Sequence, residues 1–149
     1  MQRIFHTPEG VRDIYSQECS RKQKLQEKLH RVFHQYGFED IETPTFEYFE
    51  VFSKEVGTIP SRDLYKFFDR EGNTLVLRPD FTPSVSRACA TYFNPEKEVV
   101  SLCYTGNTFI NNSSFRGRLK ETTQMGVERM GDDSPEADAE ILAMTVECL

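Results

Sequence analysis

A stripe of apolar residues with helical spacing is the feature that most constrains the fold. Within the segment from Ser16 to Tyr36 its members fall at i, i+4, i+7, i+8 and i+11, namely Leu25, Leu29, Val32, Phe33 and Tyr36. This spacing predicts a helix with one face buried against other elements. Gly37 is expected to end the helix, because glycine accepts the backbone conformation that closes a last turn.

Several β-prone segments supply the partners for this helix. We expect a strand from Phe38 to Thr43, with Phe38 and Ile41 in the core, and Pro44 places that strand at a sheet edge or leads it out of the sheet. The remaining expected segments are a short aromatic helix over 46–52, a loop over 56–62, a hairpin of 64–68 and 74–77 around the turn 69–73, and strands over 99–109 and 120–130.

Two further helices complete the expected layout. Thr82 and Pro83 suit the start of a helix that reaches Phe93, and Ser134 followed by Pro135 suits the start of another. The order of elements predicts an α+β fold, with a mainly antiparallel sheet flanked by helices. The last helix is still running at Leu149, so we expect residues 1–149 to be the N-terminal part of a longer domain.

Composition narrows the class of protein. A chain of 149 residues is the usual size of one domain, and its net charge of −6 argues against general nucleic-acid binding. The four cysteines form no C-x-x-C pair, so we expect mostly buried, reduced thiols, as in the cytoplasm. No stretch reaches the length of a membrane span or a signal peptide core.

The strand expected over 120–130 carries an unusual polar face. Side chains alternate along a strand, so Gln124, Gly126 and Glu128 share one face, opposite Met125 and Val127 on the core face together with Thr123. An amide and a carboxylate separated by a glycine are suited to a binding floor, in which the glycine leaves room for a ligand. A solvated sheet face is the alternative.

The junction between the strand ending at Leu77 and the following helix carries a second polar group. Asp80 and Thr82 could point into a cleft there, or they could only cap the helix. Together with Gln124 and Glu128 they would suit a cationic or zwitterionic small ligand, because an amino group favours a carboxylate partner.

Two weaker patterns remain. The basic run from Arg116 to Lys120 could hold a phosphate or an acidic partner, or be a solvated turn. His30 and His34 are four residues apart on the first helix and could share a metal ion, but no third ligand lies near them in the sequence, so no metal site is expected.

Taken together, four segments resemble the catalytic core of class II histidyl-tRNA synthetases. They are Thr7–Asp13, Tyr36–Pro44, Leu77–Thr82 and Gln124–Glu128. In that family the second segment builds a dimer interface, and the third and fourth line the histidine pocket. The resemblance therefore implies a class II synthetase-like core, a homodimer contact from Glu39 to Phe46, and a histidine pocket formed by Asp80, Thr82, Gln124 and Glu128.

One departure from the synthetase pattern concerns the phosphate site. Synthetases have Phe-Arg-x-Glu in their second motif, where the arginine holds the α-phosphate, whereas this chain has Phe109-Ile110-Asn111-Asn112. Isoleucine offers no hydrogen-bond donor. Arg118 matches a later arginine of the same loop and is the remaining candidate for a phosphate contact.

The stretches Tyr104–Ser114, Gly117–Glu121 and Glu136–Glu140 resemble a non-catalytic branch of this family, the regulatory subunits of ATP phosphoribosyltransferase. That resemblance implies no catalytic residues and no cofactor. It also implies a cytoplasmic hetero-oligomer with the short catalytic subunit, with a role in histidine biosynthesis and its feedback control by histidine. A histidyl-tRNA synthetase fragment and a stand-alone histidine-binding dimeric scaffold remain the alternatives.

Overall fold

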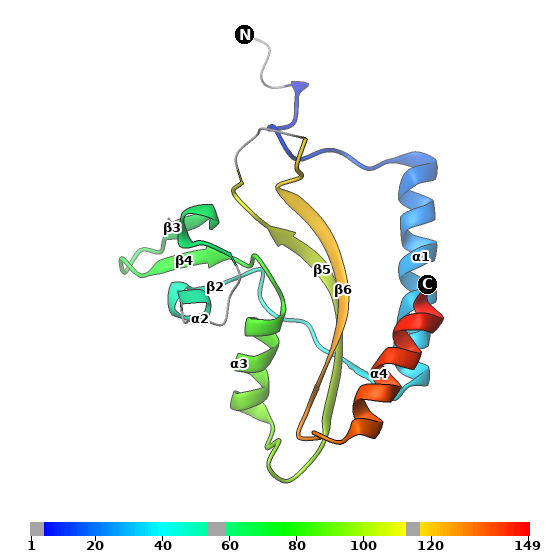
Figure 1. The fold of residues 1–149 in the computed structure, drawn as a ribbon. Coiled ribbons are helices and arrows are strands. Elements are labelled where there is room, and N and C mark those ends of the chain that lie inside the picture. Colours follow the sequence, from blue (N-terminus) through cyan, green and yellow to red (C-terminus); the bar gives the residue numbers. More distant parts are fainter. Residues whose placement is uncertain (1–4, 54–58, 113–116) are drawn as a thin grey trace. The chain divides into compact units, whose positions relative to one another are not determined.

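The computed structural model describes residues 5–53, 59–112 and 117–149 (Figure 1). Part of the expected loop over 56–62, Arg116 of the basic run, and Ser113 and Ser114 lie outside the described residues. The elements in chain order are α1 (Ser16–Gln35), β1 (Glu39–Asp40), β2 (Phe46–Tyr48), α2 (Phe49–Ser53), the 3₁₀ turn η2 (Ser61–Asp63), β3 (Lys66–Phe68), β4 (Thr74–Leu77), α3 (Thr82–Tyr92), β5 (Val100–Phe109), β6 (Glu121–Met130) and α4 (Pro135–Cys148).

The chain divides into two compact units. The first unit contains residues 1–14, 43–84 and 106–124, and the second unit contains residues 15–42, 85–105 and 125–149. Helix α3 and strands β5 and β6 each pass from one unit into the other. Each unit is described by itself below.

The first unit contains a three-stranded antiparallel sheet in the order β2-β4-β3. The hairpin of β3 and β4 confirms the expected one. The expectation of a helix from residue 46 was wrong, because Phe46–Tyr48 is a strand and only Phe49–Ser53 is helical. Phe46 pairs with Leu77 and Tyr48 with Leu75, so sheet pairing decided the conformation of a segment whose aromatic composition suits either structure.

The second unit holds β1 on the edge of the sheet β1-β5-β6. The expected edge position is confirmed, although the strand is only two residues long and pairs parallel with β5, Glu39 opposite Leu102 and Asp40 opposite Cys103. The α+β class with helices and mixed sheets is as expected from the sequence.

The core of the second unit gathers around α1. Phe33, Phe38, Cys103 and Met144 are buried together. Residues packed against them include Leu29, Val32, Tyr36, Met125, Val127 and Ile141. The helical stripe and the core face of β6 are therefore confirmed for these positions, and α4 lies beside α1 (Figure 1). Leu25, at the start of the stripe, is exposed.

The core of the first unit is a separate cluster. Phe52, Leu64 and Val76 are buried together, with Phe49, Val51 and Ile59 packed against them. Val76 is completely buried, so the middle strand β4 turns the face that carries Val76 toward this core. The opposite face of the same sheet carries exposed aromatic side chains, which are described below.

The helix ends follow the sequence signals. Gly37 has a φ of +79°, directly after the last turn of α1. The Ser134 hydroxyl accepts a hydrogen bond from the Ala137 N–H at 3.2 Å, and Pro135 occupies the first turn of α4. Within the described residues, every helix is too short or too polar to cross a membrane. The four cysteines are free thiols, and Cys89 and Cys103 are buried.

Candidate functional site

The junction between β4 and α3 is organised by a buried arginine. The Arg78 guanidinium donates to three backbone carbonyls, those of Asn107 at 2.8 Å, Thr43 at 2.9 Å and Pro44 at 3.3 Å. The same group lies over the Phe81 ring, 4.1 Å from its centroid. Arg78 therefore holds the chain before β2, the strand β5 and the start of α3 in one arrangement.

A glycine on β5 makes this arrangement possible. A Cβ atom added at Gly106 would lie 2.6 Å from Nη2 of Arg78 and 2.7 Å from Cζ of Phe81. Neither side chain can move easily, because Phe81 and Arg78 are both buried. The sequence hint to the structural role of Arg78 is its position directly after strand β4 and directly before Pro79.

The structure brings two of the predicted ligand-binding residues together. Gln124 Nε2 donates to Asp80 Oδ1 at 3.4 Å, and the same oxygen accepts the Phe81 N–H at 2.8 Å. Asp80 and Gln124 are both partly buried, and Thr82 is the partly buried first residue of α3. These three residues belong to the first unit, so the carboxylate and amide predicted for one site are neighbours in it.

Glu128 and Gly126 lie on β6 in the second unit. Glu128 is partly buried. The expectation that Gly126 leaves room for a ligand was wrong, because a Cβ added there would lie 2.4 Å from the Tyr104 hydroxyl oxygen and 2.6 Å from Cζ of its ring. Tyr104 is itself buried, so its phenol fills the space above the glycine. Sequence reasoning missed this residue, because its contact with Gly126 depends on how β5 and β6 pair.

The described part of the β5 and β6 hairpin turn carries two basic residues, Arg118 and Lys120, and neither stands at position 110. The Ile110 N–H donates to the Lys120 carbonyl at 2.9 Å, and the Ile110 side chain is partly buried. The Asn112 amide donates to the Leu119 carbonyl at 3.4 Å. Arg118 is exposed. The backbone at position 110 therefore belongs to the hairpin, and its side chain offers carbon atoms alone.

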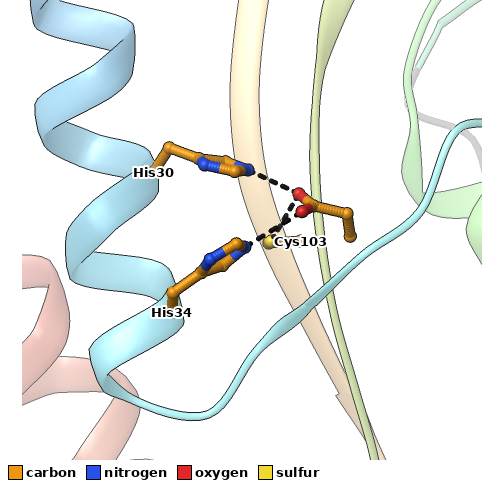
Figure 2. A network of polar contacts seen from close by, with 4 residues as sticks. His30, His34 and Cys103 are labelled. Atoms are coloured by element: carbon orange, nitrogen blue, oxygen red, sulfur yellow. Dashed lines mark hydrogen bonds and ion pairs between the residues drawn. The ribbon is translucent and has the colours of Figure 1, made fainter.

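A group of potential metal ligands lies in the second unit (Figure 2). His30 Nε2 lies 2.5 Å from Asp40 Oδ1, and His34 Nε2 lies 3.0 Å from Asp40 Oδ2. Cys103 Sγ lies 3.5 Å from Asp40 Oδ1. The expectation that the two histidines have no third ligand was wrong. Pairing of β1 with β5 brings Asp40 and Cys103 to them across the fold. We call these four residues the His–Asp–Cys cluster.

Hydrogen bonding and burial set the protonation of Asp40 and Cys103 in this cluster. The hydrogen bond from His30 is the main reason that the pKa of Asp40 is lowered from its usual value of 3.8. Burial, together with the nearby Asp40 carboxylate, raises the pKa of the Cys103 thiol to about 12. Asp40 is therefore an anion and Cys103 a protonated thiol in the metal-free protein at neutral pH.

Curated relatives resemble the chain over almost its full length. It is 44% identical over 145 residues to the ATP phosphoribosyltransferase regulatory subunit of Ruminiclostridium cellulolyticum. The aligned region is 97% of this chain and 35% of the relative. It is 42% identical over 145 residues to the protein of the same name from Acetivibrio thermocellus, again with 97% and 35% coverage. The chain thus spans about a third of the length of these relatives.

Solved structures show the same fold. The solved structure of an ATP phosphoribosyltransferase regulatory subunit/histidyl-tRNA synthetase from Bacillus halodurans matches with a TM-score of 0.84 and 32% identity over 97% of this chain and 37% of that one. Apo histidyl-tRNA synthetase from S. aureus matches with a TM-score of 0.76 and 26% identity over 97% of this chain and 34% of that one. The sequence profile described as Histidyl-tRNA synthetase matches residues 10–149. The chain therefore belongs to the histidyl-tRNA synthetase family.

Proposed function

We propose that this chain is a non-catalytic regulatory subunit of ATP phosphoribosyltransferase, which supports the activity of a separate catalytic chain and its inhibition by histidine. The relatives that carry this name are similar to 97% of the chain. The observation that carries the proposal is Ile110, because it stands where the synthetase pattern has the arginine that holds the α-phosphate.

The hairpin geometry supports the absence of synthetase activity. Ile110 has no donor to direct at a phosphate, and the Asn112 amide is engaged with the Leu119 carbonyl. Loss of one preorganised donor at a developing charge costs on the order of 10²–10³ in rate. Arg118 alone, on an exposed part of the hairpin, does not replace a donor at position 110.

Histidine-dependent exchange of pyrophosphate into ATP tests this part of the proposal. The chain is expected to show no exchange above a protein-free blank, and an authentic histidyl-tRNA synthetase serves as the positive control. The double variant Ile110→Arg/Asn112→Glu, which restores the synthetase residue types, shows whether these two positions are the barrier. Exchange catalysed by the unaltered chain would contradict the proposal.

Association with a catalytic subunit tests the regulatory role itself. We expect the chain to copurify with a short-form ATP phosphoribosyltransferase catalytic chain when the two are expressed together, and to raise its activity in a histidine-sensitive way. The free thiols agree with the reducing cytoplasm, where we place this complex. If the catalytic chain neither binds this protein nor changes in activity, the regulatory assignment fails.

We further propose that Asp80, Thr82, Gln124 and Glu128 form a histidine-binding pocket. The contact between Gln124 and Asp80 supports it, because an amide that donates to a carboxylate orients that carboxylate for the amino group of a ligand. Asp80 is partly buried, so a charge partner there gains more than it would on an open surface.

Calorimetry with L-histidine tests the pocket. Asp80→Asn and Glu128→Gln are each expected to weaken binding about ten-fold or more, because a hydrogen bond to a charged group contributes roughly 1.5–3 kcal/mol. Glu71→Gln, an equivalent change at an exposed turn residue, is the matched control and should leave the affinity unchanged. Parental affinity in both pocket variants would remove these residues from histidine binding.

We also propose a homodimer through the region from Glu39 to Phe46. The register of the first-unit sheet places Phe46, Tyr48, Phe67, Leu75 and Leu77 on one face, which we call the aromatic sheet face. Phe46 is 49% and Tyr48 55% exposed, and Phe46 contacts Phe67 edge to face at 5.6 Å. Large aromatic side chains grouped on one exposed sheet face are typical of a protein–protein contact.

Sedimentation velocity tests this contact. The unaltered chain is expected to sediment as a dimer and Phe46→Asp as a monomer, because a carboxylate would be buried without a partner. Phe68→Asp is the control, since Phe68 is 72% exposed but alternates to the other face of β3. A Phe46→Asp protein that remains dimeric would exclude this face.

A further inference from the structure

The His–Asp–Cys cluster converges from three separate elements of the second unit (Figure 2). His30 and His34 lie one turn apart on α1, and both direct Nε2 at the Asp40 carboxylate. Asp40 lies on β1, and Cys103 is its partner on β5. The four candidate ligand atoms all lie within 4.8 Å of one another.

We propose that His30, His34, Asp40 and Cys103 form a binding site for a zinc ion. Two imidazole nitrogens, a carboxylate oxygen and a sulfur are the ligand types that Zn²⁺ uses in proteins, commonly four at a time in a tetrahedron. The mixture of nitrogen, oxygen and sulfur favours Zn²⁺ over the hard cations Mg²⁺ and Ca²⁺, which bind oxygen ligands.

The present spacing is close to that of a loaded site. Ligand atoms 2.0–2.3 Å from a tetrahedral zinc ion lie roughly 3.3–3.8 Å from one another. The imidazoles would therefore have to withdraw slightly from Asp40, with which they now form hydrogen bonds. The side chains can rotate to make this adjustment, because those of His30, His34 and Asp40 are 38%, 46% and 58% exposed.

The backbone around the cluster is already in place. Strand pairing aligns Asp40 with Cys103, and the Ile41 N–H donates to the Cys103 carbonyl at 2.9 Å. Both histidines lie on the regular helix α1, which is anchored by Phe33 in the core of the second unit. Zinc binding would therefore join α1 to β1 and β5 without a new fold, and binding to the folded state would stabilise the second unit.

The alternative is an ordinary hydrogen-bonded cluster in which Asp40 accepts from both imidazoles and Cys103 is a core residue. The two interpretations differ at sulfur. A buried thiol binds zinc as a thiolate, so the ion would have to displace the Cys103 proton. Direct evidence for a metal–sulfur bond therefore decides between them.

Titration of the untagged, chelator-stripped chain tests the proposal. Calorimetry should show one Zn²⁺ bound per chain. Co²⁺ in the same site should give the intense visible bands of tetrahedral coordination and a near-ultraviolet sulfur-to-cobalt band. His34→Ala should weaken Zn²⁺ binding about ten-fold or more, since even loss of a residue that only orients a ligand costs 10–100-fold.

Matched controls come from the chain itself. His6 is the one histidine of the chain that lies outside the cluster, and Cys19 is a thiol remote from the cluster in sequence. His6→Ala and Cys19→Ser should therefore change neither the Zn²⁺ affinity nor the Co²⁺ spectrum. Cys103→Ser should abolish the sulfur band. Because Cys103 is fully buried, the exposed His34 variant keeps the test valid if the serine variant does not fold. No Zn²⁺ binding, parental affinity in His34→Ala, or no sulfur-to-cobalt band in the unaltered chain would each overturn the proposal.

Discussion

The buried position of the Tyr104 ring depends on the absence of a side chain at Gly126. The phenol of Tyr104 occupies the position that a side chain at residue 126 would need. The sequence predicts that the glycine leaves space for a ligand, but in the structure a protein side chain takes that space. Any ligand at this face of β6 would therefore meet the phenol of Tyr104 instead of an open floor.

Gly126→Ala is expected to destabilise the protein by about 1–3 kcal/mol, the usual cost of forcing extra carbon into a packed interior. The added Cβ would lie 2.4 Å from the Tyr104 hydroxyl, and the buried ring cannot rotate away freely. Urea denaturation followed by circular dichroism measures the loss. In the Tyr104→Ala background the same substitution should cost much less, and an equal cost in both backgrounds would show that the ring is not responsible.

Arg78 is a second residue whose role is local and structural. Its guanidinium satisfies three backbone carbonyls, and replacement by methionine would leave them without that donor. Because an unsatisfied buried polar group costs roughly 1–3 kcal/mol, we expect Arg78→Met to lower the free energy of unfolding by about 2–4 kcal/mol. Arg70→Met, at the exposed turn 69–73, is the control for loss of a positive charge and should change stability little in the same urea titration.

At the level of elements, strand pairing outweighed local composition in the segment from Phe46 to Ser53. Its density of aromatic residues predicted one short helix, but β4 offers hydrogen-bonding partners to its first three residues. The register then places Glu47 toward the buried face and Phe46 and Tyr48 outward. A segment this short has little helix propensity of its own, so the neighbouring strand determines where the helix begins.

The turn between β3 and β4 depends on an ionised carboxylate. Asp69 accepts hydrogen bonds from the backbone of Glu71 and Asn73 and from the Asn73 side chain, and the last of these is the main reason that its pKa is lowered from 3.8. A lowered pKa in the folded state means that the stabilisation is present above pH 3.8 and is lost as the pH falls through the lower folded value.

Asp69→Asn should therefore be less stable than the unaltered protein at pH 7, and the difference should shrink by pH 3. Urea denaturation of both proteins at the two pH values measures this, and taking the difference removes the effect of other carboxylates that titrate in the same range. A difference that is unchanged between pH 7 and pH 3 would show that the carboxylate charge does not support the turn.

At the level of the whole molecule, contacts between distant parts of the sequence build each core. Met144 on α4 packs with Phe33 on α1 and Cys103 on β5, although more than a hundred residues separate the first two. Met144→Ala should cost about 2–5 kcal/mol, because removal of a buried side chain leaves a cavity. Val146→Ala, two residues further along on an exposed face, should cost far less, and similar losses in both would mean that α4 does not dock through Met144.

The sequence alone determined the features that depend on short-range spacing. The stripe of α1, the glycine after it, the Ser134 cap and the β3 and β4 hairpin follow from helical periodicity and turn chemistry, which act over a few residues. The family resemblance came from short segments of the same kind. The sequence named Asp80 and Gln124 as candidate ligand contacts, but their meeting depends on the fold, because they lie 44 residues apart.

Only the tertiary structure decided which distant side chains meet. Cys103 is sixty-three residues beyond Asp40, and it reaches the histidines because β1 pairs parallel with β5. Likewise, Tyr104 fills the space at Gly126. Arg78 finds its carbonyl partners on β5 and on the chain segment before β2. Strand order and register depend on the sum of many weak contacts over the whole chain, so no local pattern in the sequence encodes these neighbours.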